Sequence, residues 1–132
     1  MSKVHINLTS TITQEEQTEV VRQEADGEMR LDGEIKRISY ESDSIPVKMM
    51  LREQDLFIHR GVDRANFSLM HFVLGEKGNC KYVVEGRQMD LISETKHLEF
   101  KEFDDHQQLQ VEYDLFSGVN LIGSYSVTLI FA

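Results

Sequence analysis

The chain has 132 residues, enough for one hydrophobic core of ordinary domain size. Its net charge of -9 repels phosphate backbones and makes nucleic acid an unfavourable partner. A single cysteine permits no internal disulfide, and no apolar stretch approaches the roughly 20 residues that span a bilayer. We therefore expect one cytoplasmic domain over residues 1–132, with neither nucleic acid nor a membrane as partner.

Apolar residues alternate with polar ones in run after run, which is typical of strands with one buried face. The first expected strand covers residues 4–13. Residues 14–25 are ambiguous, because good helix formers follow a helix capping box that begins at Thr13. A period of two, however, places Val21, Ala25 and Gly27 on one face. We favour a strand over residues 18–31 and leave the helix open.

The dipeptide Asp32-Gly33 is a strong hairpin signal and predicts a two-residue turn. This register pairs Gly27 with Ile38 and Ala25 with Tyr40. A small residue then lies opposite a large one on the inner face, so the hairpin fills its interior without a clash.

A second hairpin is predicted around Glu53-Gln54, between strands at residues 47–52 and 55–60. Its register places Arg60 opposite Val47, in the apolar phase, and pairs Met50 with Phe57 on the outer face. Further strands are expected at residues 66–73, 79–85, 87–96, 98–103, 108–116 and 121–131. In the last strand, Leu121 shares the apolar phase of the residues that follow it.

About eight to ten short strands joined by tight turns predict an all-β fold. Short connections favour a closed antiparallel up-and-down barrel over a sandwich, which usually needs longer crossings between its sheets.

A set of short motifs occurs along the chain. In chain order they are Tyr40-Glu41, Arg60-Gly61, Phe72-Val73-Leu74-Gly75, Tyr82, Gly86, residues 89–95 and Tyr113-Asp114. This ordered set resembles the YwiB-like family of uncharacterised bacterial proteins. The resemblance implies a calycin-like barrel, related in shape to lipocalins, with about eight main strands. It implies no function.

The sequence contains no recognisable metal, cofactor or catalytic motif. The five histidines show neither HxH nor HxxxH spacing, and Cys80 lacks a CxxC partner. No G-x-S-x-G elbow or phosphate loop is present. Cys80 shares the apolar phase, so we expect it to be a small core residue. We expect no cofactor, and we favour a non-enzymatic protein over an enzyme.

Arg60 is the most informative polar residue, because a permanent cation in the inward phase must find acceptors. Four other polar residues lie in phases that we interpret as inward: Tyr82, Ser93, Thr95 and Tyr113. Together these five side chains predict a polar barrel mouth that binds a small anionic ligand. The structural alternative is that Arg60 sits at a barrel end, where it caps the barrel or pairs with a core-facing carboxylate such as Glu34.

A protein of a different class is also compatible with the sequence. Met50 and Phe57 form an apolar spot on the predicted outer face, which suits a protein partner or a second copy of the chain. We therefore keep an interaction or self-assembling module as the alternative to a ligand-binding barrel.

Overall fold

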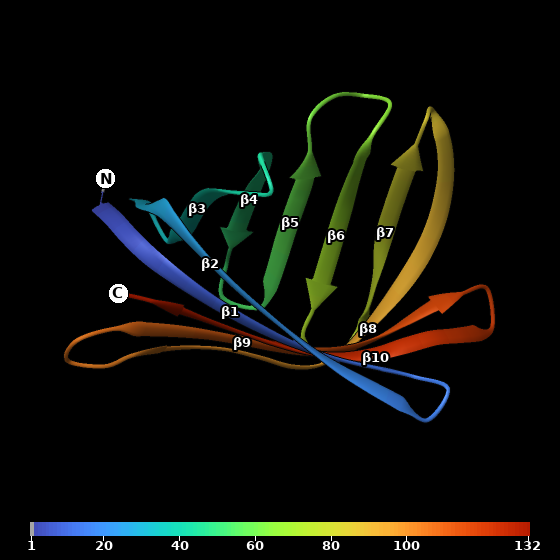
Figure 1. Cartoon of the computed structure of the whole chain (residues 1–132). Helices are drawn as coiled ribbons and strands as arrows, with labels where there is room; N and C mark the ends of the chain where they lie inside the picture. The colour runs from blue at the N-terminus through green and yellow to red at the C-terminus, as the bar shows by residue number, and fades with distance from the viewer. Residues whose placement is uncertain (1) are drawn as a thin grey trace.

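In the computed structural model, which describes residues 2–132, ten antiparallel strands close into a barrel (Figure 1). Each strand pairs with its neighbours in sequence, and β1 also pairs with β10, which completes the circle. The predicted all-β, closed antiparallel barrel is confirmed. The strands are β1 (Ser2–Gln14), β2 (Gln17–Asp32), β3 (Ile35–Ser42), β4 (Ile45–Leu51), β5 (Asp55–Gly61), β6 (Phe67–Val73), β7 (Lys77–Val84), β8 (Arg87–Glu102), β9 (Gln107–Ser117) and β10 (Asn120–Phe131).

Two long strands connect the two layers of the barrel. Residues 17–29 of β2 pair with β1, whereas residues 27–32 pair with β3. Similarly, residues 87–94 of β8 pair with β7, and residues 92–102 pair with β9. Figure 1 shows β3 to β7 standing upright, with β1, β9 and β10 lying across below them. Thus β2 and β8 are corner strands that belong to both layers.

The ambiguous segment after β1 is a hairpin and not a helix. Gln14 pairs with Gln17, and the two residues between them, Glu15 and Glu16, have φ angles of 47° and 68°. Positive φ at both central positions is the geometry of a type I′ turn, which matches the twist of the flanking strands. The strand that we favoured over residues 18–31 is therefore confirmed.

The register predicted for the next hairpin is wrong by two residues. Asp32 pairs with Ile35, so the turn consists of Gly33 and Glu34. Only Gly33 has a positive φ, 64°, which fits a type II′ turn with glycine at its first central position. Consequently Gly27 lies opposite Tyr40 and not opposite Ile38. A shift of two residues leaves every side chain on the expected face.

The register of the β4–β5 hairpin is as predicted. Leu51 pairs with Leu56, Met50 with Phe57, and Val47 with Arg60. Arg60 therefore occupies the inward phase of β5.

In β8 and β10 the predicted strand bounds or side-chain directions are wrong, because each strand contains a bulge. The expected break between strands near residue 97 is absent, because β8 is continuous and carries a bulge at Lys96. In β10, a bulge between Leu121 and Gly123 turns Leu121 outward, where it is 55% exposed. Ile122 packs against the core in its place. A bulge adds one residue to a strand and reverses the alternation beyond it.

Apolar side chains from every strand meet inside the barrel. The most deeply buried include Leu56, Phe72, Leu109 and Leu129. Cys80 belongs to the same cluster, as expected of a small core residue. The centre of the barrel is thus a packed core, and open space lies toward its two ends.

Gly27 lies at the corner in β2, where this strand pairs with both β1 and β3. A Cβ atom there would lie 2.5 Å from the Ser39 carbonyl oxygen and 2.9 Å from Tyr40 Cβ. Because the first of these atoms is backbone, Gly27→Val should destabilise the fold by about 1–3 kcal/mol through overpacking. Chemical denaturation of this variant and of Glu28→Val, on the exposed face of the same strand, measures the difference. Equal losses in the two variants would contradict the corner packing.

Candidate ligand-binding site

Arg60 lies at the end of the barrel that carries the β5–β6 loop. Its neighbours across the ladder are Val47, which is buried, and Ser68. The side chain is exposed, because this inward position is close to the barrel mouth. None of the ion pairs formed among residues 2–132 involves Arg60. Arg60 thus lies at a barrel end, as the structural alternative expected, but the pair with Glu34 is wrong, since Glu34 lies in the β2–β3 turn at the opposite end.

A pocket of about 220 Å³ opens beside Arg60. Tyr82 and Ser68 line the pocket with it, and Asn66 contributes an amide from the loop. Apolar side chains form the rest of the wall: Ile45, Val62, Phe67, Val83 and Val84. The pocket therefore combines one cation with a mainly apolar surface, which is the usual composition of a small-molecule site.

Arg60 lies close enough to two tyrosines for its positive charge to affect their pKa values. Burial raises the pKa of Tyr82 above its ordinary value, and the Arg60 cation opposes part of that rise. Burial likewise raises the pKa of Tyr40, again opposed by Arg60. Both hydroxyls thus stay protonated at neutral pH and can donate hydrogen bonds. Tyr40 was missed in the sequence, although its inward phase and its position opposite Val47 could have identified it.

Tyr113 lies deeper, on the layer that faces Tyr82. It pairs across the ladder with Thr95 and Tyr125, and its ring stacks on that of Tyr125 with centroids 4.9 Å apart. Phe72 packs on it at 4.3 Å. Burial strongly raises the pKa of Tyr113, and the neighbouring hydroxyls of Tyr82 and Tyr125 raise it further. All four tyrosines of the chain therefore contribute to one aromatic interior.

The remaining two predicted residues have separate environments. Ser93 is fully buried, and its hydroxyl donates to the His71 carbonyl oxygen at 2.7 Å. Thr95 is 2% exposed, and its hydroxyl has no hydrogen-bond partner within the part of the chain that the structure describes. The structure thus brings Arg60 and Tyr82 to one pocket and pairs Tyr113 with Thr95. Ser93 lies at the β6–β7 boundary, away from the Arg60 pocket.

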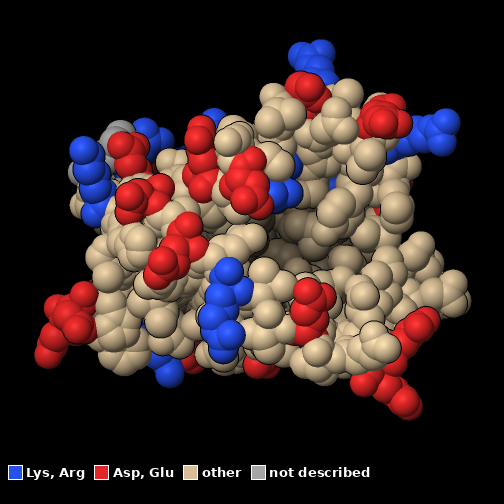
Figure 2. Space-filling view, in the orientation of Figure 1, with Lys and Arg blue, Asp and Glu red and all other residues tan. Residues whose placement is uncertain are grey.

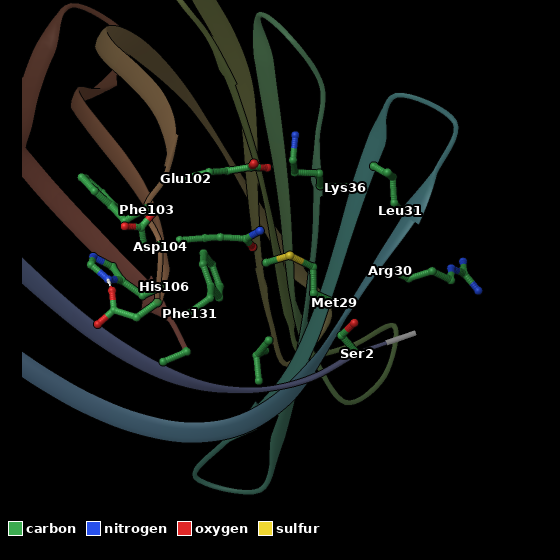
Figure 3. Close-up of a pocket in the computed structure, with 14 residues that line it drawn as sticks. Ser2, Met29, Arg30, Leu31, Lys36, Glu102, Phe103, Asp104, His106 and Phe131 are labelled. Atoms are coloured by element: carbon green, nitrogen blue, oxygen red, sulfur yellow. Dashed lines mark hydrogen bonds and ion pairs between the residues drawn. The ribbon is translucent and has the colours of Figure 1, made fainter.

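The opposite end of the barrel contains a hollow of about 440 Å³ (Figure 3). Met29, Phe131 and Lys36 are among the residues that line it. The loop between β8 and β9 adds Phe103, whose ring stacks on His106, and the carboxylates of Asp104 and Asp105; Glu102 at the end of β8 adds a third. Because charges of both signs surround this hollow, it favours no particular ligand charge.

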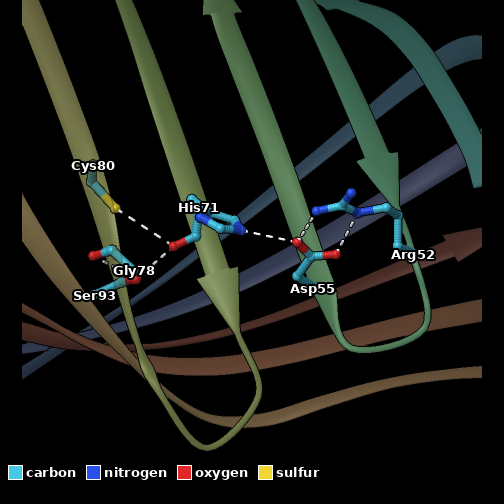
Figure 4. Close-up of polar contacts among 6 residues, drawn as sticks. All are labelled: Arg52, Asp55, His71, Gly78, Cys80 and Ser93. Atoms are coloured by element: carbon cyan, nitrogen blue, oxygen red, sulfur yellow. Dashed lines mark hydrogen bonds and ion pairs between the residues drawn. The ribbon is translucent and has the colours of Figure 1, made fainter.

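An ion-pair network lies on the outer face of β5 and β6 (Figure 4). Asp55 accepts a hydrogen bond from Arg52 Nε at 2.8 Å and lies 3.0 Å from His71 Nε2. The His71 ring stacks on Phe57, with centroids 3.9 Å apart and an interplanar angle of 4°. Hydrogen bonds from Arg52, and then from His71, hold the pKa of Asp55 below its ordinary value of 3.8 despite partial burial. No sequence motif marks this network, because it joins residues of β5 and β6 with Arg52 of the β4–β5 turn.

Among residues 2–132, no three side chains of His, Cys, Asp or Glu are arranged to hold a metal ion. The described part of the chain also contains no helix that is long and apolar enough to cross a membrane.

The fold is a ten-stranded antiparallel barrel, and Arg60 occupies an inward register position at one of its ends. Residues 6–129 match the family described as "Domain of unknown function (DUF1934)", and the chain belongs to this family. Its structure is similar to the crystal structure of the ywiB protein from Bacillus subtilis, with a TM-score of 0.84 at 18% sequence identity. The match covers 98% of this chain and 90% of the other. The predicted resemblance to the YwiB-like family is thus confirmed.

No curated protein matches the chain. The structural similarity at this low identity shows the fold alone, and the calycin-like assignment stays a prediction.

Asp55 provides a pH-dependent test of the outer-face network. Its lowered pKa in the folded state stabilises the protein above pH 3.8, and this contribution disappears as the pH falls through the folded-state pKa. Asp55→Asn should therefore cost about 1–2 kcal/mol at pH 7, where hydrogen bonds to a carboxylate are lost. As the pH falls below 3.8 and through the folded-state pKa, the gap between variant and wild type should narrow.

Urea denaturation at several pH values measures this gap. Glu53→Gln, an exposed change in the same turn, is the control and should track the wild type throughout. A gap that persists unchanged at pH 3 would show that the Asp55 charge is not what stabilises the fold.

Proposed function

We propose that the protein is a non-enzymatic barrel that binds a small anionic ligand at the mouth beside Arg60. The observation that carries this proposal is the unpaired guanidinium, which lies in an inward register position and lines a pocket. A cation among apolar walls gains free energy when an anion supplies acceptors for its five N–H donors. A charge-assisted pair with a carboxylate or phosphate oxygen meets that requirement.

The electrostatics of the molecule make this cation distinctive. The chain carries a net charge of -9, and Figure 2 shows acidic and basic side chains interspersed around a recess in one face. The lining of the Arg60 pocket includes no carboxylate. An anion is therefore attracted at this position without a directly opposing charge, while the molecule as a whole repels polyanions.

The walls of the pocket are held in place by hydrogen bonds. Asp63 Oδ1 accepts from the backbone amides of Ala65 and Asn66, both at 2.9 Å, which fixes the β5–β6 loop. The Gly86 amide donates to the Ala65 carbonyl at 3.0 Å, and the Glu85 amide donates to the Asn66 side chain at 3.2 Å. These contacts tie the loop to the β7–β8 turn. A preformed pocket lowers the entropy cost of binding.

Self-association through Met50 and Phe57 has less support. The two residues pair on the outer face, but the Phe57 ring is stacked on His71 and lies 5.4 Å from the Arg52 guanidinium. These neighbours cover part of the apolar surface that a partner would need. This alternative therefore stays a prediction.

We also propose a cytoplasmic location. The single cysteine, Cys80, supports it, because a protein without disulfides gains nothing from an oxidising compartment.

Calorimetric titration with inorganic phosphate, benzoate and hexanoate at constant ionic strength tests the proposed function. At least one of these anions should bind the wild type, and Arg60→Met should weaken its binding about 10- to 100-fold, the effect of losing a charge-assisted hydrogen bond. Arg64→Met is the matched control, since Arg64 is exposed on the same loop but does not line the pocket.

Tyr82→Phe removes the hydroxyl and keeps the aromatic ring. This variant should weaken binding less than Arg60→Met does. If none of the three anions binds, or if Arg60→Met binds as well as Arg64→Met, the proposed function is wrong.

A further inference from the structure

The wall of the barrel is weakly paired at one place. Only three residue pairs join β6 to β7, from Phe67↔Val83 to Leu69↔Lys81, although both strands continue toward their shared turn. Beyond these pairs, Leu74, the residue that follows β6, forms an isolated bridge with Thr95 of β8. We call the stretch where the ladder stops the β6–β7 seam; it comprises residues 70–73 and 77–80.

Side chains hold the inner side of this seam (Figure 4). The His71 carbonyl oxygen accepts the Ser93 hydroxyl at 2.7 Å and lies 4.0 Å from the Cys80 sulfur. A Cβ atom at Gly78 would lie only 2.0 Å from the same oxygen, so the close approach of the two backbones requires glycine. The seam is thus a defined feature of the fold and not a fraying ladder.

A pocket of about 570 Å³ opens at the seam. Its outer wall contains Phe57, Leu69 and Ile92, which point away from the core by strand phase. Cys80 and Leu91, both buried members of the core cluster, also line it. Because the ladder stops here, core side chains border a pocket that otherwise belongs to the outer face. This volume is within the range of small-molecule sites.

One wall of the seam pocket is a rigid aromatic surface. The His71 ring is stacked on Phe57 at 3.9 Å, and its Nε2 lies 3.0 Å from Asp55. Asp55 is itself bound by Arg52, so the imidazole has a fixed orientation. Because His71 and Arg52 already cover the Phe57 ring, the His71 ring, whose side chain is 26% exposed, is the ordered flat group on which a planar ligand can stack at little entropy cost.

We propose that the β6–β7 seam binds a neutral, planar aromatic molecule. The charges at the pocket balance, because Lys81 lies directly opposite Asp90 across the ladder. Asn79 supplies an amide that can bind a ring nitrogen or a carbonyl group. This site is separate from the Arg60 pocket, with no lining residue in common, and does not depend on the proposed function.

Cys80, the one thiol of the chain, reports on occupancy of the seam. Indole is the probe, and methyl methanethiolsulfonate is a small neutral reagent that modifies the thiol. Indole at ten times its dissociation constant should raise the melting temperature and slow modification of Cys80 about tenfold. Benzoate, which is aromatic but charged, should protect Cys80 much less.

Two variants fill the pocket from its outer wall. Ile92→Trp and Leu69→Trp should each abolish protection by indole, whereas Val20→Trp, on an exposed strand face elsewhere, should keep it. Arg60→Met should also keep it, because that residue belongs to the other pocket. Two variants are used so that a folding defect in one does not decide the result.

The absence of indole protection in the wild type would overturn the proposal. Protection that persists in whichever Trp variant is folded would overturn it as well, because binding would then lie elsewhere.

Discussion

Closure of the barrel depends on two strands that change partners along their length. Backbone hydrogen bonds leave no long edge unpaired only if β2 and β8 each serve both layers. Gly27 permits the first corner, because a side chain there would collide with the Ser39 carbonyl. The bulge at Lys96 provides the second. These two corners let a single sheet enclose the core and leave two open ends, one of which carries Arg60.

The two candidate sites, the Arg60 pocket and the seam pocket, lie in different parts of the barrel wall and offer different chemistry. At the mouth, strands end and polar side chains reach solvent, so Arg60 can remain charged above a packed core. At the seam, the β6–β7 ladder stops although the two backbones stay close, and the Ser93 hydroxyl binds the His71 carbonyl oxygen there. One site offers a cation and the other an ordered aromatic face. Their ligands should therefore differ in charge.

Alternation of apolar residues was sufficient to predict the fold class, most strands and the inward phase of Arg60. It predicted the β4–β5 register on the assumption of a two-residue turn at Glu53-Gln54, and the Arg52 amide does donate to the Asp55 carbonyl across that turn. It failed for β2–β3, where Gly33 adopts the first central position of the turn and not the second. The bulges at Lys96 and Ile122 were also missed, since one extra residue leaves no mark in an alternating pattern. The seam could not be foreseen, because it arises from the approach of Gly78 to His71 between strands.

A crystal structure of the wild type grown with benzoate or hexanoate tests the central claim, that Arg60 faces a ligand and not a protein carboxylate. The account predicts a carboxylate of the added acid within about 3 Å of the Arg60 guanidinium, in the pocket lined by Tyr82. An Arg60 side chain paired with a carboxylate of its own chain, with the added acid absent from that pocket, would contradict it.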